Sequence, residues 1–156
     1  MTVLHALAAM AILASPVTEA AVGAPPAEAF FAVSVADLDG SERWYCDNLE
    51  LHEIWRSDPK APWGAARVLE GGSVMVELIH KGTAPALPMA AEAEGLGLRK
   101  AGFSVADLDR RRVLWRTNGV RIAYRFHDEA TGRETAIIAD PEGNLIQVFG
   151  PPGATR

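Results

Sequence analysis

Six residues, SVADLD, occur twice in the chain, at 34–39 and again at 104–109. The two copies are 70 residues apart, and the same offset relates other positions without any adjustment. A period this long, present only twice, predicts two copies of one supersecondary unit that pack together, rather than a stacked solenoid. Like residues related by this offset are Tyr45 and Trp115, Asn48 and Asn118, and Val76 and Ile146.

The composition is that of one folded domain. The 156 residues are 49% hydrophobic and 22% charged, which is enough apolar material for a single core. The net charge is −5 and the only basic run is Arg110 to Arg112, so we expect no nucleic-acid partner. The single cysteine, Cys46, cannot form an internal disulfide.

Residues 1–28 differ in character from the rest of the chain. The apolar run at 3–14 is too short to span a bilayer, so we expect no stable membrane insertion of the mature domain. With small residues at Thr18 and Ala20, the segment is typical of a secretory signal peptide cleaved after Ala20. We therefore expect export to the periplasm or the exterior. The alternative is a cytoplasmic protein with an N-terminal extension, or a start codon assigned too early.

Each copy begins with a segment in which every second residue is apolar, and this alternation predicts a β-strand with one apolar face. We expect a helix to cover that face. The opposite face carries small residues, including Ser34 and Ser104, which would leave room for a ligand. The residues of the two apolar faces are Phe31, Val33 and Val35, and Ala101, Phe103 and Val105.

An aspartate opens a helix after each first strand. In the first copy Asp37 or Asp39 is the predicted N-cap, and Glu42 would complete a capping box with Asp39. Asn118 and Gly119 are predicted to end the second helix. Aromatic residues on the helical stripes, Trp44 and Trp115, are expected in the core.

Three more strands follow the helix in each copy. They are predicted at 53–57, 65–69 and 73–79, and at 121–126, 134–139 and 144–149. The fold class is therefore α+β, with two βαβββ modules that form a curved mixed sheet around a central cavity. The modules span about 29–80 and 99–150, with a linker at 81–98 and a C-terminal tail at 151–156.

The paired modules, together with the closing segment DPEGNLIQVF at 140–149, resemble the vicinal oxygen chelate superfamily of glyoxalases, bleomycin-resistance proteins and extradiol dioxygenases. The resemblance covers about residues 29–150. It implies the fold, but members range from isomerases and dioxygenases to plain drug-binding proteins. It also implies a homodimer, in which the halves of two chains complete each other's cavities.

In members that bind a metal, the ligands stand at the start of the first strand and in the last strand of each module. The resemblance carries these positions to Phe30 and Glu77, and to Lys100 and Gln147. A phenyl ring has no donor atom, and a protonated amine has no lone pair to give. We therefore expect no metal at this position and no cofactor.

The same positions supply the candidate site. Glu77 and Lys100 are the candidate catalytic residues; they could balance each other's charge, or one could act as a general base. Tyr124 and Phe126 share one strand face and could extend an aromatic wall. The predicted ligand-binding residues are Phe30, Ser34, Trp55, Trp63, Glu77, Lys100, Ser104, Tyr124 and Gln147.

Two classes of function remain open at this point. The first is a small-molecule-binding protein that sequesters a drug or metabolite without chemistry. The alternative is a metal-independent lyase or isomerase that uses Glu77 or Lys100 as base, and a third possibility is a purely structural module. A metal site built elsewhere is not expected, since alternation places Glu77 and His80, a carboxylate and an imidazole close together along one strand, on opposite strand faces.

Overall fold

A computed structural model of the chain describes residues 28–62, 64–82 and 98–152. Trp63, the predicted leader up to residue 27, and most of the predicted linker lie outside these residues. The first module contains β1 (Ala29–Val35), α1 (Leu38–Leu49), β2 (His52–Arg56), β3 (Ala66–Gly71) and β4 (Val74–His80). The second contains β5 (Ala101–Ser104), α2 (Leu108–Thr117), β6 (Ile122–Asp128), β7 (Arg133–Ala139) and β8 (Leu145–Phe149).

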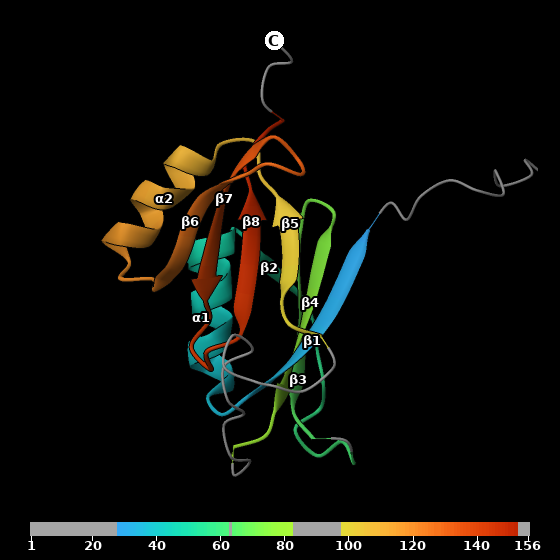
Figure 1. Cartoon of the computed structure of the whole chain (residues 1–156). Helices are drawn as coiled ribbons and strands as arrows, with labels where there is room; N and C mark the ends of the chain where they lie inside the picture. The colour runs from blue at the N-terminus through green and yellow to red at the C-terminus, as the bar shows by residue number, and fades with distance from the viewer. Residues whose placement is uncertain (1–27, 63, 83–97, 153–156) are drawn as a thin grey trace, which may run out of the picture.

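Each module folds as a four-stranded mixed sheet with one helix (Figure 1). The strand orders are β1-β4-β3-β2 and β5-β8-β7-β6, and in both sheets the first strand runs parallel to the last. Ala32 pairs with Glu77 and Gly102 pairs with Gln147, so the sequence offset is kept in three dimensions. The predicted pair of βαβββ modules is confirmed.

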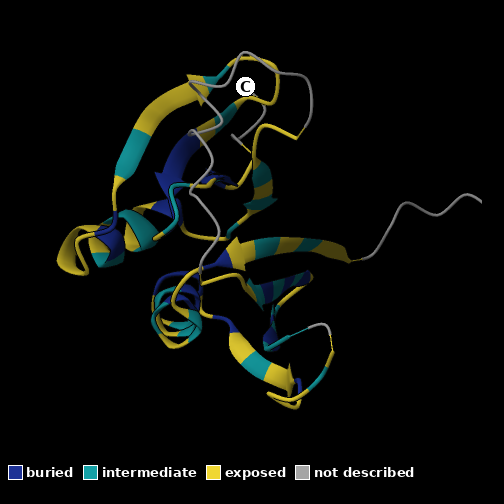
Figure 2. Ribbon diagram, turned by 90° about the horizontal axis from the view of Figure 1, so that it is seen from below, coloured by how far each residue is buried: buried dark blue, intermediate teal, exposed yellow. Residues whose placement is uncertain are grey.

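The helix-covered faces of the two sheets meet in one hydrophobic core. Phe31 and Phe103, from the two predicted apolar faces, both pack against it. The helices α1 and α2 contact each other, and Figure 2 shows them next to each other with buried segments around them. The helix-covered side of each sheet is therefore filled by the helices and by core side chains from both modules. Buried members of the core include Val35, Val76, Leu78, Trp115, Ile146 and Val148.

The last turn of α1 forms polar contacts that join the modules. Asn118 Nδ2 donates a hydrogen bond to Asn48 Oδ1 at 2.9 Å, and Trp115 Nε1 donates to the Asn48 carbonyl at 2.9 Å. Asn48 and Asn118 are related by the repeat, so equivalent positions of the two modules contact each other here. Trp115 is fully buried, and a buried indole N–H needs an acceptor. Asn48 therefore has a structural role at the centre of the molecule.

Tyr45, the repeat equivalent of Trp115, makes a second contact between the modules. Its hydroxyl donates to Asp140 Oδ2 at 2.8 Å, and both residues are buried. Asp140 also accepts from the backbone N–H groups of Glu142 and Asn144. Burial raises the pKa of Asp140, and burial followed by the Asp140 charge raises the pKa of Tyr45. The pair holds the turn between β7 and β8 against α1.

The two helices begin in the same way. Asp37 and Asp107 are the N-caps, and each accepts a hydrogen bond from the N–H three residues later. The predicted capping box is wrong, because Asp39 and Glu42 both bind the Arg67 guanidinium instead of the helix end. Gly119 has φ +69° after the second helix, as its predicted capping role requires. Neither of the helices in the described residues is long and apolar enough to cross a membrane.

Removing the Tyr45 hydroxyl should weaken the contact between the modules. We expect Tyr45→Phe to lower the free energy of unfolding by about 1–2 kcal/mol, because the buried Asp140 carboxylate loses one of its hydrogen-bond donors. Urea unfolding followed by circular dichroism measures the change. Tyr124→Phe is the control, since Tyr124 is 53% exposed, and equal stabilities of the two variants would contradict the structural role of the Tyr45 hydroxyl.

Candidate functional site

Phe30 and Glu77 lie on the face of the first sheet that α1 does not cover. Phe30 pairs with Met75 and Ala32 with Glu77, and paired residues of adjacent strands share a face. Trp55 lies on the same face, two strands away from Glu77 and opposite Val68. Phe30 is 57% and Trp55 45% exposed, whereas Glu77 is half-buried. We call this the outer face of the first sheet; its predicted site residues are Phe30, Ser34, Trp55 and Glu77.

Gln147 lies on the corresponding face of the second sheet. It pairs with Gly102 in β5 and with Ile137 in β7, and Tyr124 in β6 lies opposite Ile137. Gln147 is buried, while Tyr124 and Phe126 are exposed along β6. We call this the outer face of the second sheet; its predicted site residues are Ser104, Tyr124 and Gln147.

Part of this second face is apolar and closed. Ile137, Ala139 and Leu145 form a small cluster of buried residues, separate from the main core. At the strand end, Arg133 donates a hydrogen bond to Ser104 Oγ at 2.7 Å, so this predicted ligand-binding hydroxyl already has a protein partner. Most of the exposed surface on the outer face of the second sheet therefore belongs to β6.

Lys100 lies just before β5 and is exposed. It lines a pocket of about 130 Å³ at the junction of the modules, together with Phe31, Tyr45 and Asn144. Within the described ranges, no ion pair joins Lys100 to Glu77. The charge balance considered for these two residues is therefore not formed inside one chain.

Three residues that the sequence reasoning missed extend the outer face of the first sheet. Glu70 pairs with Met75 on one side and with His52 on the other, and all three share the face of Glu77. The alternation along β3 and β4 was the signal that could have found them. They add a carboxylate, an imidazole and a thioether beside the predicted site.

The side chains at the usual ligand positions do not fit a metal ion. Glu77 and Gln147 supply oxygen donors, but the matching first-strand positions hold Phe30 and Lys100. His80 Nε2 lies 3.1 Å from the carbonyl oxygen of Ala36, on the strand face opposite Glu77. In the part of the chain that the structure describes, no three His, Cys, Asp or Glu side chains gather in a way that could hold a metal.

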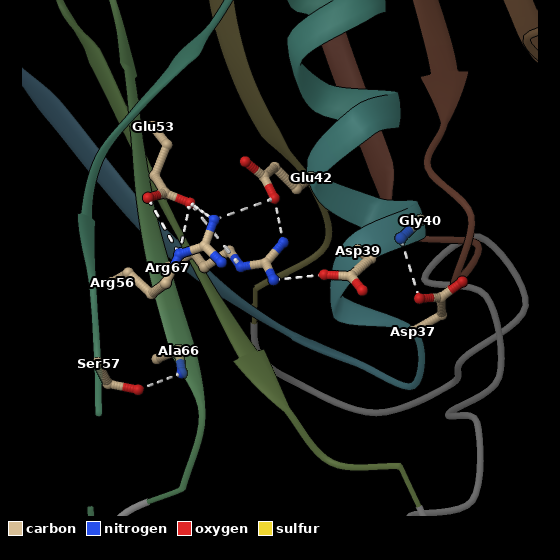
Figure 3. A network of polar contacts seen from close by, with 9 residues as sticks. All are labelled: Asp37, Asp39, Gly40, Glu42, Glu53, Arg56, Ser57, Ala66 and Arg67. Carbon is tan, nitrogen blue, oxygen red and sulfur yellow. Dashed lines mark hydrogen bonds and ion pairs between the residues drawn. The ribbon is translucent and has the colours of Figure 1, made fainter. Parts of the chain in front are cut away.

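A charged cluster lies on the helix-covered side of the first sheet (Figure 3). The buried Arg67 guanidinium binds Asp39 and Glu42 of α1, and its Nε lies 3.9 Å from Glu53 Oε2. Arg56 Nε donates to both Glu53 oxygens, at 3.2 and 3.1 Å. Hydrogen bonding to Arg67 lowers the pKa of Asp39, and hydrogen bonding to Arg56 lowers that of Glu53. These ion pairs tie α1 to β2 and β3, so the cluster is structural.

Comparisons with known proteins agree with this architecture. The model of the Glyoxalase/Bleomycin resistance protein/Dioxygenase superfamily matches residues 29–148. The solved structure of SMU.1112c is 24% identical with a TM-score of 0.67, covering 77% of this chain and 95% of that chain. A glyoxalase family protein from Enterococcus faecalis is 20% identical with a TM-score of 0.63, covering 79% and 94%.

A lactoylglutathione lyase from Agrobacterium tumefaciens is similar at 20% identity and a TM-score of 0.55, covering 81% of this chain and 94% of that chain. No curated protein matches the chain. At these identities the similarity to solved structures establishes the fold and leaves the activity to be argued from the site.

The Arg67 cluster predicts a specific pH dependence of stability. The pKa values of Asp39 and Glu53 are lowered in the folded state, so their contribution is present above their unfolded values and is lost as pH falls through the folded ones. We expect Arg67→Met to be less stable than the wild type at pH 7, and the difference to shrink on acidification to pH 3. Urea unfolding at several pH values measures it, with the exposed Arg116→Met as control. A difference that does not change with pH would contradict the electrostatic role.

Proposed function

The chain belongs to the Glyoxalase/Bleomycin resistance protein/Dioxygenase superfamily, and we propose that it is a small-molecule-binding protein whose usual metal position has lost its ligand set. The observation that carries the proposal is the register. Glu77 and Gln147 occupy equivalent places beside the two first strands, but the accompanying positions are Phe30 and Lys100. One carboxylate, one amide, one amine and one ring suit ligand contact better than metal coordination.

The exposed side chains favour a planar or amphipathic ligand. Phe30, Trp55 and Tyr124 are each about half exposed, and such rings offer a large contact area with few torsions to fix. Glu77 and Lys100 add charges of opposite sign, and Gln147 adds a donor and an acceptor. A drug or metabolite with an aromatic part and polar groups at its edge matches this set.

We further propose that the complete site forms between two chains. Inside one chain the helix-covered faces meet in the core, so the two outer faces do not enclose a common space. A second copy, placed with the outer face of its second sheet over the first sheet, would bring Gln147 of the partner subunit towards Glu77. A closed two-fold dimer would then contain two equal sites, and it would cover the exposed rings of both faces.

The second candidate function is a metal-independent lyase or isomerase. Glu77 favours it, because this half-buried carboxylate has no ion-pair partner among the described residues and is available as a general base. Lys100, which is exposed, is the alternative base, and Gln147 would hold a substrate oxygen.

Substitution of the two charged residues should separate binding from catalysis. If the protein only binds, Glu77→Gln and Lys100→Met should each weaken the affinity by about tenfold through loss of a charged contact. If Glu77 is a general base, Glu77→Gln should reduce turnover about 10²–10⁴-fold. The ligand is the compound that copurifies or, if none does, the anionic dye anilinonaphthalene sulfonate, for which only Lys100→Met should weaken binding and Glu77→Gln should strengthen it by removing a like charge. Glu129→Gln, in an exposed turn, is the control, and unchanged affinity in both site variants would contradict the proposed site.

Native mass spectrometry with elemental analysis should find two chains and no stoichiometric Fe, Ni, Zn or Mn. Tyr124→Lys should shift the protein towards the monomer, because the charge would lie in the covered face. Val113→Lys is the matched control: Val113 is 54% exposed, but it lies on α2 rather than on an outer face. A monomeric wild type would refute the two-chain site, and a bound metal that a chelator removes would refute the assignment of its residues.

A further inference from the structure

A pocket lies where the edges of the two sheets approach each other. β1 and β5 are edge strands, each paired on one side only, and within the described residues no strand pairing joins the two sheets. Residues 31–33 of β1 and residues 98–101, which lead into β5, line the space between them. The start of β8 and Tyr45 of α1 complete the lining. These residues all belong to one chain, so the pocket needs no partner subunit.

Most of the side chains that line this pocket, which we call the junction pocket, are apolar. Its volume is about 130 Å³. An apolar cavity of about 150 Å³ lined by Leu, Ile and Phe takes up benzene, so the junction pocket has room for one ring or for a branched chain of similar size. Its apolar side chains and its aromatic hydroxyl-bearing ring are those of Phe31, Val33, Tyr45, Leu98, Leu145 and Ile146.

The charged side chains that line the junction pocket are positive. Among the described residues they are Arg99 and Lys100, and this part of the lining includes no aspartate or glutamate. Lys100 is exposed and has no ion-pair partner in the part of the chain that the structure describes. Glu77 belongs to β4, on the paired edge of β1, and is not in the lining. The pocket therefore combines an apolar interior with an amine that can receive an anion.

The carboxylate of Asp140 does not compete for this role. It is not in the lining, although two lining residues bind it: the Tyr45 hydroxyl and Asn144 Nδ2 donate to its Oδ2, at 2.8 and 2.9 Å. Two backbone N–H groups donate to its Oδ1. Both oxygens of this buried group thus have donors inside the protein, and these bonds also hold Tyr45 and Asn144 in place at the pocket.

We propose that the junction pocket binds a small hydrophobic carboxylate, with its ring or branched chain inside and its carboxylate at Lys100. Removal of the apolar group from water supplies most of the affinity. Lys100 adds a charge-assisted contact that a neutral compound lacks and that a cation would oppose. The proposal deepens the proposed function by naming a class of ligand, and it rests on that function only through Lys100, which belongs to both sites.

Amide NMR of the full chain tests the proposal, with sodium benzoate as the probe and sodium chloride holding the ionic strength constant. The signals of Ala101 and Ile146, both in the lining, should shift and saturate. Acetate has the charge without the ring and should not saturate them. Benzylammonium has the ring with the opposite charge and should bind about fivefold more weakly than benzoate, or weaker still. Lys100→Met should weaken benzoate binding about two- to fivefold and leave that of benzyl alcohol unchanged.

Two variants change the size of the pocket in opposite directions. Ala101→Leu adds volume to the lining and should abolish the response to benzoate, whereas Ala29→Leu, on the exposed start of β1 and outside the lining, is the matched control. Val33→Ala removes volume from the lining and should raise the affinity for naphthoate relative to benzoate. This change of selectivity decides the question even if Ala101→Leu does not fold.

The possible failures of the two proposals can be told apart. The junction pocket is refuted if Ala101 and Ile146 do not saturate with benzoate, if benzylammonium binds as tightly, or if Val33→Ala leaves the selectivity unchanged. Benzoate that saturates the indole signal of Trp55 instead would place the ring on the outer face of the first sheet, which refutes the junction pocket and not the proposed function. Unchanged benzoate affinity in Tyr124→Lys supports a pocket formed by one chain, even if the wild type proves to be monomeric.

Discussion

The contact between the two helices, centred on Asn48 and Asn118, is the constraint on which the rest of the structure depends. The Asn48 carbonyl satisfies the buried indole N–H of Trp115, and its side-chain oxygen satisfies the amide of Asn118. Buried polar groups without partners are costly, so these bonds define how the modules meet. Because the helices turn towards each other, both outer faces turn towards solvent. The proposal that the ligand site forms between two chains rests on this packing of the helices.

Local patterns in the sequence predicted most of the fold. Alternation and the 70-residue repeat predict the strands, their apolar faces and the two βαβββ modules, since these depend on residues close in the chain or on the repeat itself. Alternation also placed Tyr124 on the same side as Phe126, whereas Phe30 and Glu77 were brought together by the family resemblance.

What could not be predicted depends on residues far apart in the chain. Asp39 and Glu42 have the spacing of a capping box, but Arg67 in β3 binds both, and no local rule contains that competitor. The direction in which the modules face each other depends on Tyr45 meeting Asp140, 95 residues away.

The duplication makes each half of the chain a reference for the other. Positions needed for folding keep their chemistry: Asp37 and Asp107 cap their helices alike, and Tyr45 and Trp115 both bring a buried donor to the other module. Where the two halves share the same backbone position but differ in the side chain, the requirements of folding do not explain that difference. Glu142 and Gly72 form such a pair: Glu142 accepts a hydrogen bond from the N–H before α1, whereas Gly72 has no side chain that could do the same at α2. The acceptor that Glu142 supplies at α1 is thus a feature of one half only, and the repeat by itself does not predict it.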